Sequence, residues 1–144
     1  MSKLIGIACD HAGYELKEFI LGWLSSKGFD VVDYGCSSPE RVDYPDYGHA
    51  LAKGIESGEI KRGVGICGSG VGISMVLNRH KGVRAGLCWS EEIARLVKEH
   101  NNANVVVLPG RFVTNDEAMA IVDAWLTSEF EGERHQARID KIEL

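Results

Sequence analysis

Residues 63–72 read Gly-Val-Gly-Ile-Cys-Gly-Ser-Gly-Val-Gly, a short apolar run that passes directly into a glycine-rich turn. The apolar half has the length of a buried strand, and the apolar spacing after the turn predicts a helix over 71–79. A strand, a tight turn and a helix in this order form the repeating unit of parallel α/β sheets. This stretch therefore predicts an α/β fold whose functional groups lie at the junctions between strands and helices.

The same alternation continues on both sides of this stretch. Runs rich in β-branched residues predict five buried parallel strands, and stretches with helical apolar spacing separate them, with Ser90 and Asn115 as N-caps. Right-handed crossovers then give an open five-stranded sheet that is covered by helices on both faces. The expected strands cover 4–9, 30–34, 63–67, 83–88 and 104–109, and the expected helices cover 14–27, 45–57, 71–79, 90–100 and 115–130.

The size and composition of the chain are those of one globular domain. Its 144 residues contain no linker, repeat or low-complexity segment, so a single domain over 1–144 is expected. The net charge of −5 gives no general attraction to nucleic acid or anionic membranes, and no apolar run approaches the ~20 residues that span a bilayer. The lack of a signal-peptide pattern and of paired cysteines predicts a soluble, cytoplasmic protein with free thiols.

The turn at residues 68–72 can direct backbone N–H groups at a negative charge. Cys67 precedes it, at the carboxyl end of a strand and beside a helix N-terminus, where the thiolate is favoured and can act as a base or a nucleophile. A phosphatase loop of the Cys-x5-Arg type would need arginine where this chain has Ile73, so the turn suits the oxyanion of an enediolate better than a transferring phosphoryl group. From this segment alone, Cys67 as a buried packing residue remains an open alternative.

Other titratable residues also occur at predicted junctions. Asp10 and His11 follow the first strand, where they can orient sugar hydroxyls or contact phosphate. His100 lies where the fourth helix ends, and it could donate a proton as an acid. Taken singly, both histidines fit a capping or surface role as well, and His49 and His80 are interpreted as solvated helix-face residues. No triad or metal-ligand pattern occurs, so no metal is expected.

The final segment, 132–144, gathers basic residues in an otherwise acidic chain. Helical spacing would place Arg134 and Arg138 on one face of it. Such a tail gains a function only if it packs over a site, either of its own chain or of a partner.

Five motifs in this order resemble those of the type B ribose-5-phosphate isomerases, whose family also includes galactose-6-phosphate isomerase subunits. The resemblance covers nearly the whole chain. It implies a Rossmann-like three-layer α/β/α fold, no cofactor, and a homodimer whose active sites are completed by residues of both chains, with pairing into tetramers left open. The residues that carry it are Cys9-Asp10-His11-Ala12-Gly13, Asp43-Tyr44-Pro45, Ile66-Cys67-Gly68-Ser69-Gly70-Val71-Gly72-Ile73-Ser74, Glu99-His100-Asn101-Asn102-Ala103-Asn104 and Phe130-Glu131-Gly132-Glu133-Arg134-His135-Gln136-Ala137-Arg138.

The resemblance also implies a role for each matching residue. Cys67 would shuttle a proton between C1 and C2, with Ser69 in the catalytic loop at a position where many relatives have threonine, and His100 would open the furanose ring as an acid. One branch of the family uses a glutamate further along the loop, but this chain has Met75 there and matches the cysteine branch. The implied sugar-binding residues are Asp10, His11, Tyr44, Gly68, Ser69, Gly70, Val71, Gly72 and Asn101. The implied phosphate ligands are His11, Arg111, Arg134 and Arg138.

The implied reaction interconverts ribose 5-phosphate and ribulose 5-phosphate through a cis-enediolate, a step of the non-oxidative pentose phosphate pathway. The alternatives are the same isomerisation of allose 6-phosphate or galactose 6-phosphate, and a non-catalytic module that binds sugar phosphates. An intact set of motifs in one chain favours the pentose, because the galactose enzyme divides its motifs between two different subunits.

Overall fold

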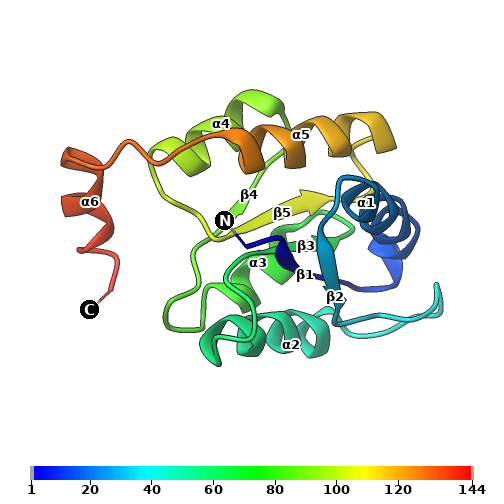
Figure 1. Cartoon of the computed structure of the whole chain (residues 1–144). Coiled ribbons are helices and arrows are strands. Elements are labelled where there is room, and N and C mark those ends of the chain that lie inside the picture. The colour runs from blue at the N-terminus through cyan, green and yellow to red at the C-terminus, as the bar shows by residue number, and fades with distance from the viewer. Residues whose placement is uncertain (1, 144) are drawn as a thin grey trace.

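The computed structural model describes residues 2–143 as a five-stranded sheet with helices on both of its faces (Figure 1). Met1 and Leu144, which belong to the expected domain over 1–144, lie outside the described residues. The strands are β1 (Leu4–Cys9), β2 (Asp30–Asp33), β3 (Gly63–Cys67), β4 (Ala85–Leu87) and β5 (Val105–Pro109). The helices are α1 (Tyr14–Ser26), α2 (Tyr44–Glu56), α3 (Val71–Leu77), α4 (Glu91–Glu99), α5 (Asn115–Thr127) and α6 (Arg134–Ile139), with a short 3-10 turn, η1 (His11–Gly13), after β1.

All neighbouring strands are parallel, and their order across the sheet is β2-β1-β3-β5-β4. Cys9 of β1 pairs with Ile66 of β3, and Cys67 pairs with Pro109 of β5. The chain first builds the β2 side of β1 and then the β3 side, so the strand order reverses between β1 and β3. In open α/β sheets such a reversal creates a crevice at the carboxyl ends of the two strands, where ligands bind.

Helices α1, α4 and α5 cover one face of the sheet, and α2 and α3 cover the other (Figure 1). The larger core lies under the first group and includes the buried side chains of Ile20, Leu24 and Trp125. The smaller core lies under the second and includes Leu51 and Ile73. Because both faces are covered, the central strands are apolar at nearly every position. The predicted three-layer α/β/α architecture is confirmed.

The two predicted N-caps have different outcomes. Ser90 caps α4, and its hydroxyl accepts a hydrogen bond from the N–H of Ile93. The prediction of Asn115 as the cap of α5 is wrong, because Thr114 holds that position. Thr114 and Glu117 form a capping box in which each side chain accepts the other residue's backbone N–H, and this satisfies two donors at once.

Several elements end earlier than their apolar spacing predicts. Helix α5 ends at Thr127, because Ser128 adopts extended backbone, and helix α3 ends at Leu77 instead of residue 79. The tail does form the short helix α6, which carries Arg134 and Arg138. Among residues 2–143, no helix combines the length and the apolar character that crossing a bilayer requires.

A buried lysine ties β2 to α1, a feature that the sequence analysis did not predict. The side chain of Lys17 is 0% exposed, and Nζ donates to both carboxylate oxygens of Asp33 at 3.0 and 2.9 Å and to the carbonyl of Cys36 at 2.6 Å. Burial disfavours the charge, but the hydrogen bonds and charge of Asp33 outweigh it, so the pKa of Lys17 lies above its ordinary value.

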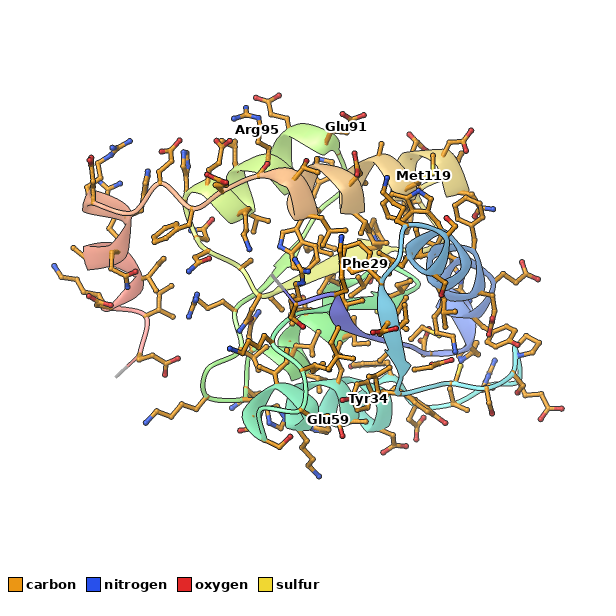
Figure 2. The ribbon with its side chains drawn as sticks, in the orientation of Figure 1. Phe29, Tyr34, Glu59, Glu91, Arg95 and Met119 are labelled. Carbon is orange, nitrogen blue, oxygen red and sulfur yellow. The ribbon has the colours of Figure 1, made fainter. Side chains whose placement is uncertain are left out.

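Just after β2, Tyr34 points towards Glu59 (Figure 2) and donates a hydrogen bond to it.

Candidate active site

The loops after β1 and β3 meet at the reversal of strand order. The N–H of Asp10 donates to the carbonyl of Ile66 at 3.2 Å, and Gly13 lies so close to Ile66 that a Cβ there would approach its side chain to 2.6 Å. The Asp10 loop therefore packs directly against Ile66, the residue that precedes Cys67 in β3. Both predicted groups of residues lie in the crevice that the topology provides.

Cys67 is the last residue of β3 and is buried, with 4% of its surface exposed. The backbone N–H groups of Gly68, Ser69 and Gly70 donate to no acceptor among residues 2–143, although Ser69 accepts the N–H of Val71 at 3.2 Å. Free donors of this kind beside a thiol can bind an oxyanion. The cradle at residues 68–72 stays a prediction, and these donors are the groups that would form it.

Gly70 is required for the shape of this loop. Its φ of +78° lies in the left-handed region, and a Cβ there would collide with Leu87 and lie 3.2 Å from the carbonyl oxygen of Leu108. A side chain at this position would therefore strain the turn into α3.

Two predicted ligand residues lie against the same loop. A Cβ at Gly72 would lie 2.7 Å from ring atoms of Tyr44, and a Cβ at Gly68 would lie 3.2 Å from Nη1 of Arg111. The backbone N–H of Arg111 also donates to the carbonyl of Gly68 at 2.9 Å, which fixes the loop after β5 beside the loop after β3. A phenol and a guanidinium therefore border the candidate oxyanion site.

Asp10 and His11 complete this group from the β1 side. Oδ1 of Asp10 accepts the N–H groups of Ala12 at 3.0 Å and Gly13 at 3.2 Å, while Oδ2 has no partner among the described residues. Nδ1 of His11 lies 3.2 Å from both the nitrogen and the carbonyl oxygen of Val42. Both side chains are thus anchored through one atom and keep a second polar atom available for a ligand.

His100 and Asn101 lie at the opposite edge of the sheet. His100 is the C-cap of α4, and β5 begins at Val105 and runs to Pro109, which pairs with Cys67. The length of β5 alone separates the two edges by roughly 13 Å. Within one chain the candidate acid His100 and the candidate base Cys67 therefore lie at opposite edges of the sheet, because helices that follow parallel strands end at the other edge.

The basic tail belongs to this second edge. Helix α6 projects beyond the amino ends of the strands (Figure 1), and a pocket of about 310 Å³ lies between it and the end of α4. The pocket brings the predicted acid His100 and the predicted sugar ligand Asn101 next to the predicted phosphate ligand Arg138. It is lined by His100, Asn101, His135, Arg138, Ile139 and Ile142. Arg134 lies on the same helix and is exposed.

The structure corrects the interpretation of His49 and His80, and it shows contacts of a further histidine, His135. His49 and His80 are not solvated singly: Nδ1 of His49 lies 2.6 Å from Nε2 of His80, whose Nδ1 lies 2.8 Å from Glu56. His135, to which the sequence assigned nothing, is buried and stacks on His100 with ring centroids 4.3 Å apart. Its position four residues after Glu131 is the one signal in the sequence, because i,i+4 spacing brings the two side chains together.

Comparison with known proteins shows the family to which this chain is similar. The family model for ribose/galactose isomerases matches residues 5–142. Ribose-5-phosphate isomerase B of Escherichia coli is 43% identical over 140 residues, which are 97% of this chain and 94% of that protein.

Two solved structures extend the comparison to the fold. Ribose 5-phosphate isomerase of Thermotoga maritima superposes with a TM-score of 0.95 at 47% identity and covers 96% of each chain. Ribose-5-phosphate isomerase B of Mycoplasma genitalium, solved with bound ribulose 5-phosphate, superposes with a TM-score of 0.93 at 47% identity over 96% of this chain and 93% of that one. This chain belongs to the ribose/galactose isomerase family.

Proposed function

We propose that this enzyme interconverts ribose 5-phosphate and ribulose 5-phosphate, with Cys67 as the base. The observation that carries the proposal is the buried thiol at the end of β3, followed directly by three backbone N–H groups that have no acceptor among residues 2–143. Moving a proton next to a carbonyl requires a base and a stabilised oxyanion within reach of the same carbon. Both are present at the crevice between β1 and β3.

The reaction divides into ring opening and proton transfer. In ring opening, His100 gives a proton to the ring oxygen as its bond to C1 breaks, and the C1 hydroxyl loses its proton to the carboxylate of Asp10. The Cys67 thiolate then removes the proton from C2, and the electrons move to the carbonyl oxygen at C1. Cys67 returns the proton to C1, while the C2 hydroxyl passes its proton to the oxygen on C1 to complete the ketose. The N–H groups of residues 68–70 hold the negative oxygen of the enediolate throughout.

The phosphate anchors the substrate away from the reacting carbons. Arg111 borders the loop after β3 and His11 belongs to the loop after β1, while Arg134 and Arg138 supply guanidinium groups from the tail. Guanidinium groups bind phosphate oxygens through paired, charge-assisted hydrogen bonds. Binding energy from the phosphate can therefore orient C1 and C2 towards Cys67.

Two copies of the chain are needed to assemble these groups. Cys67 and its loop lie at one edge of the sheet, whereas His100, Asn101 and the arginines of α6 lie at the other. In a twofold dimer, each tail edge can face the partner's loop edge, so both sites are completed at once. We therefore propose a homodimer with shared sites. Pairing into tetramers and a cytoplasmic location remain predictions from the sequence.

Conversion of ribose 5-phosphate to ribulose 5-phosphate by the purified protein, with a chelator present, tests the function. Allose 6-phosphate and galactose 6-phosphate are measured in parallel, and we expect strong turnover of the pentose. Turnover of a hexose phosphate alone would keep the mechanism and change the substrate. Binding of all three sugars without turnover would instead support a non-catalytic sugar-phosphate module.

A further inference from the structure

Three polar side chains meet at the edge that carries His100. Oε1 of Glu131 lies 3.3 Å from Nε2 of His135 and 3.9 Å from Nε2 of His100. The two imidazole rings are stacked, with centroids 4.3 Å apart and an angle of 15° between their planes. The segment is fixed to the end of α4, because the N–H of Glu131 donates to the carbonyl of Glu99 at 3.0 Å.

The distances alone would allow a metal ion, because the ligand atoms of all three residues lie within 4.8 Å of one another. The stacking argues against one. A metal lies in the plane of each imidazole that binds it, at about 2.0–2.1 Å from the nitrogen. Two nearly parallel rings whose centroids are 4.3 Å apart cannot direct both Nε2 lone pairs at one point without rotation of a side chain. The cluster is therefore better suited to holding a proton donor than a cation.

The carboxylate of Glu131 lies close to both imidazole rings of the histidine pair. Nε2 of His135 is buried and makes no hydrogen bond among residues 2–143, and the carboxylate of Glu131 lies 3.3 Å from it. His100 is 39% exposed at its side chain and is free to rotate unless the stack and the carboxylate hold it. Arg138 lines the same pocket, and Glu99 beside His100 pairs with Arg95 at 2.8 Å. Glu131 is thus the carboxylate that faces both Nε2 atoms.

We propose that Glu131 is a positioning residue, which holds the imidazole of His100, stacked on His135, in the orientation that protonates the ring oxygen of the substrate. This inference rests on the proposed function and adds a residue to it. An acid placed in the correct geometry raises the rate of a proton transfer by a factor of about 10²–10⁴, and loss of its orientation reduces that factor. Glu131 has no role in the proton transfer at Cys67, which occurs at the other edge of its own chain.

The test separates ring opening from proton transfer. Ribulose 5-phosphate forms no furanose ring because its C5 oxygen carries the phosphate. Exchange of its C1 proton with solvent deuterium therefore needs Cys67 and its loop but not the acid. We expect Glu131→Ala to lower kcat with ribose 5-phosphate about 10-fold to 100-fold while deuterium exchange falls less than about twofold. Glu131→Asp, which keeps the carboxylate, should recover part of kcat.

The matched control is Glu129→Ala, since Glu129 is exposed on the same segment and forms no ion pair or hydrogen bond among residues 2–143. This control should keep both rates. Equal loss of kcat and exchange in Glu131→Ala would make Glu131 a structural residue, and an unchanged kcat would remove any role for it. If the unmodified protein catalysed neither conversion nor exchange, the proposed function itself would be wrong and the inference would fall with it.

Discussion

Cys67 and Cys88 occupy similar places in the sheet but have different surroundings. Each lies at or just beyond the carboxyl end of a parallel strand, β3 for Cys67 and β4 for Cys88, and each is buried. Burial raises the pKa of Cys88 to about 12, so this thiol stays protonated at neutral pH. Cys67 precedes a loop with free N–H donors, whereas Cys88 precedes Trp89 and the cap of α4. The neighbouring backbone distinguishes the two.

Replacement of Cys67 by alanine should therefore abolish the base without disturbing the fold. We expect Cys67→Ala to lower kcat for ribose 5-phosphate by about 10²–10⁴, with substrate still bound. Cys88→Ala is the control, and it should retain most of the activity. Steady-state kinetics and thermal unfolding of both variants measure the effect. Equal activities for the two variants would show that Cys67 is a packing residue.

Gly70 offers a second prediction at the scale of single residues. Gly70→Ala should lower the free energy of unfolding by about 1–3 kcal/mol and reduce kcat, because a left-handed φ and a collision with Leu87 both oppose the side chain. Gly58 has a similar φ of +82° but open space around it. Gly58→Ala should therefore cost less stability, and kcat should not change. Denaturant unfolding and steady-state kinetics of both variants measure these effects. Unchanged stability and kcat in Gly70→Ala would show that the loop tolerates alanine at position 70.

At the scale of elements, the buried Lys17 connects α1 to the end of β2. Asp33→Ala would remove the carboxylate that lies closest to this buried ammonium group and leave only that of Glu18, at 3.7 Å, among residues 2–143. We expect a loss of about 2 kcal/mol, below the ~3–5 of a fully buried pair, because water reaches the side chain of Asp33, which is 38% exposed. Asp30→Ala on the same strand should change little, since Asp30 is exposed. Urea unfolding compares the two variants, and equal stabilities would show that the Lys17–Asp33 ion pair does not stabilise the fold.

The stabilisation that the Lys17–Asp33 ion pair provides should depend on pH with a definite sign. The pKa of Lys17 is raised in the folded state, so folding favours the protonated amine. The stabilisation is fully present below the ordinary lysine pKa of about 10.4 and is lost as the pH rises through the folded value. The difference in stability between the unmodified protein and Asp33→Ala should therefore shrink at strongly alkaline pH.

At the scale of the whole molecule, the separation of His100 from Cys67 predicts complementation between inactive chains. Mixing Cys67→Ala with His100→Ala, after dissociation and reassembly, should restore about a quarter of the unmodified activity, because half of the dimers are mixed and each has one intact site. Mixing Cys67→Ala with Asp10→Asn should restore nothing, because both lesions lie at the same edge. No recovery in the first mixture would contradict shared sites.

The alternation of apolar runs was enough to predict all five strands and the three layers. This is possible because a strand buried on both faces and an amphipathic helix have different local periodicities. The loop at residues 68–72 and the residues Asp10, His11 and Cys67 could be placed at one edge for the same reason. Asn115 was wrongly assigned as a cap because the reciprocal bonds of Thr114 and Glu117 depend on side-chain geometry as well as residue type.

The sequence by itself determined the order of the elements, the glycine-rich loop after β3 and the residues that match the family, because each depends on neighbours within a few positions along the chain. Only the tertiary structure decided that His100 and α6 lie at the far edge of the sheet, that His135 stacks on His100, and that Lys17 is buried beside Asp33. Those relations join segments whose separation depends on strand order and helix direction. Packing of the complete chain sets both.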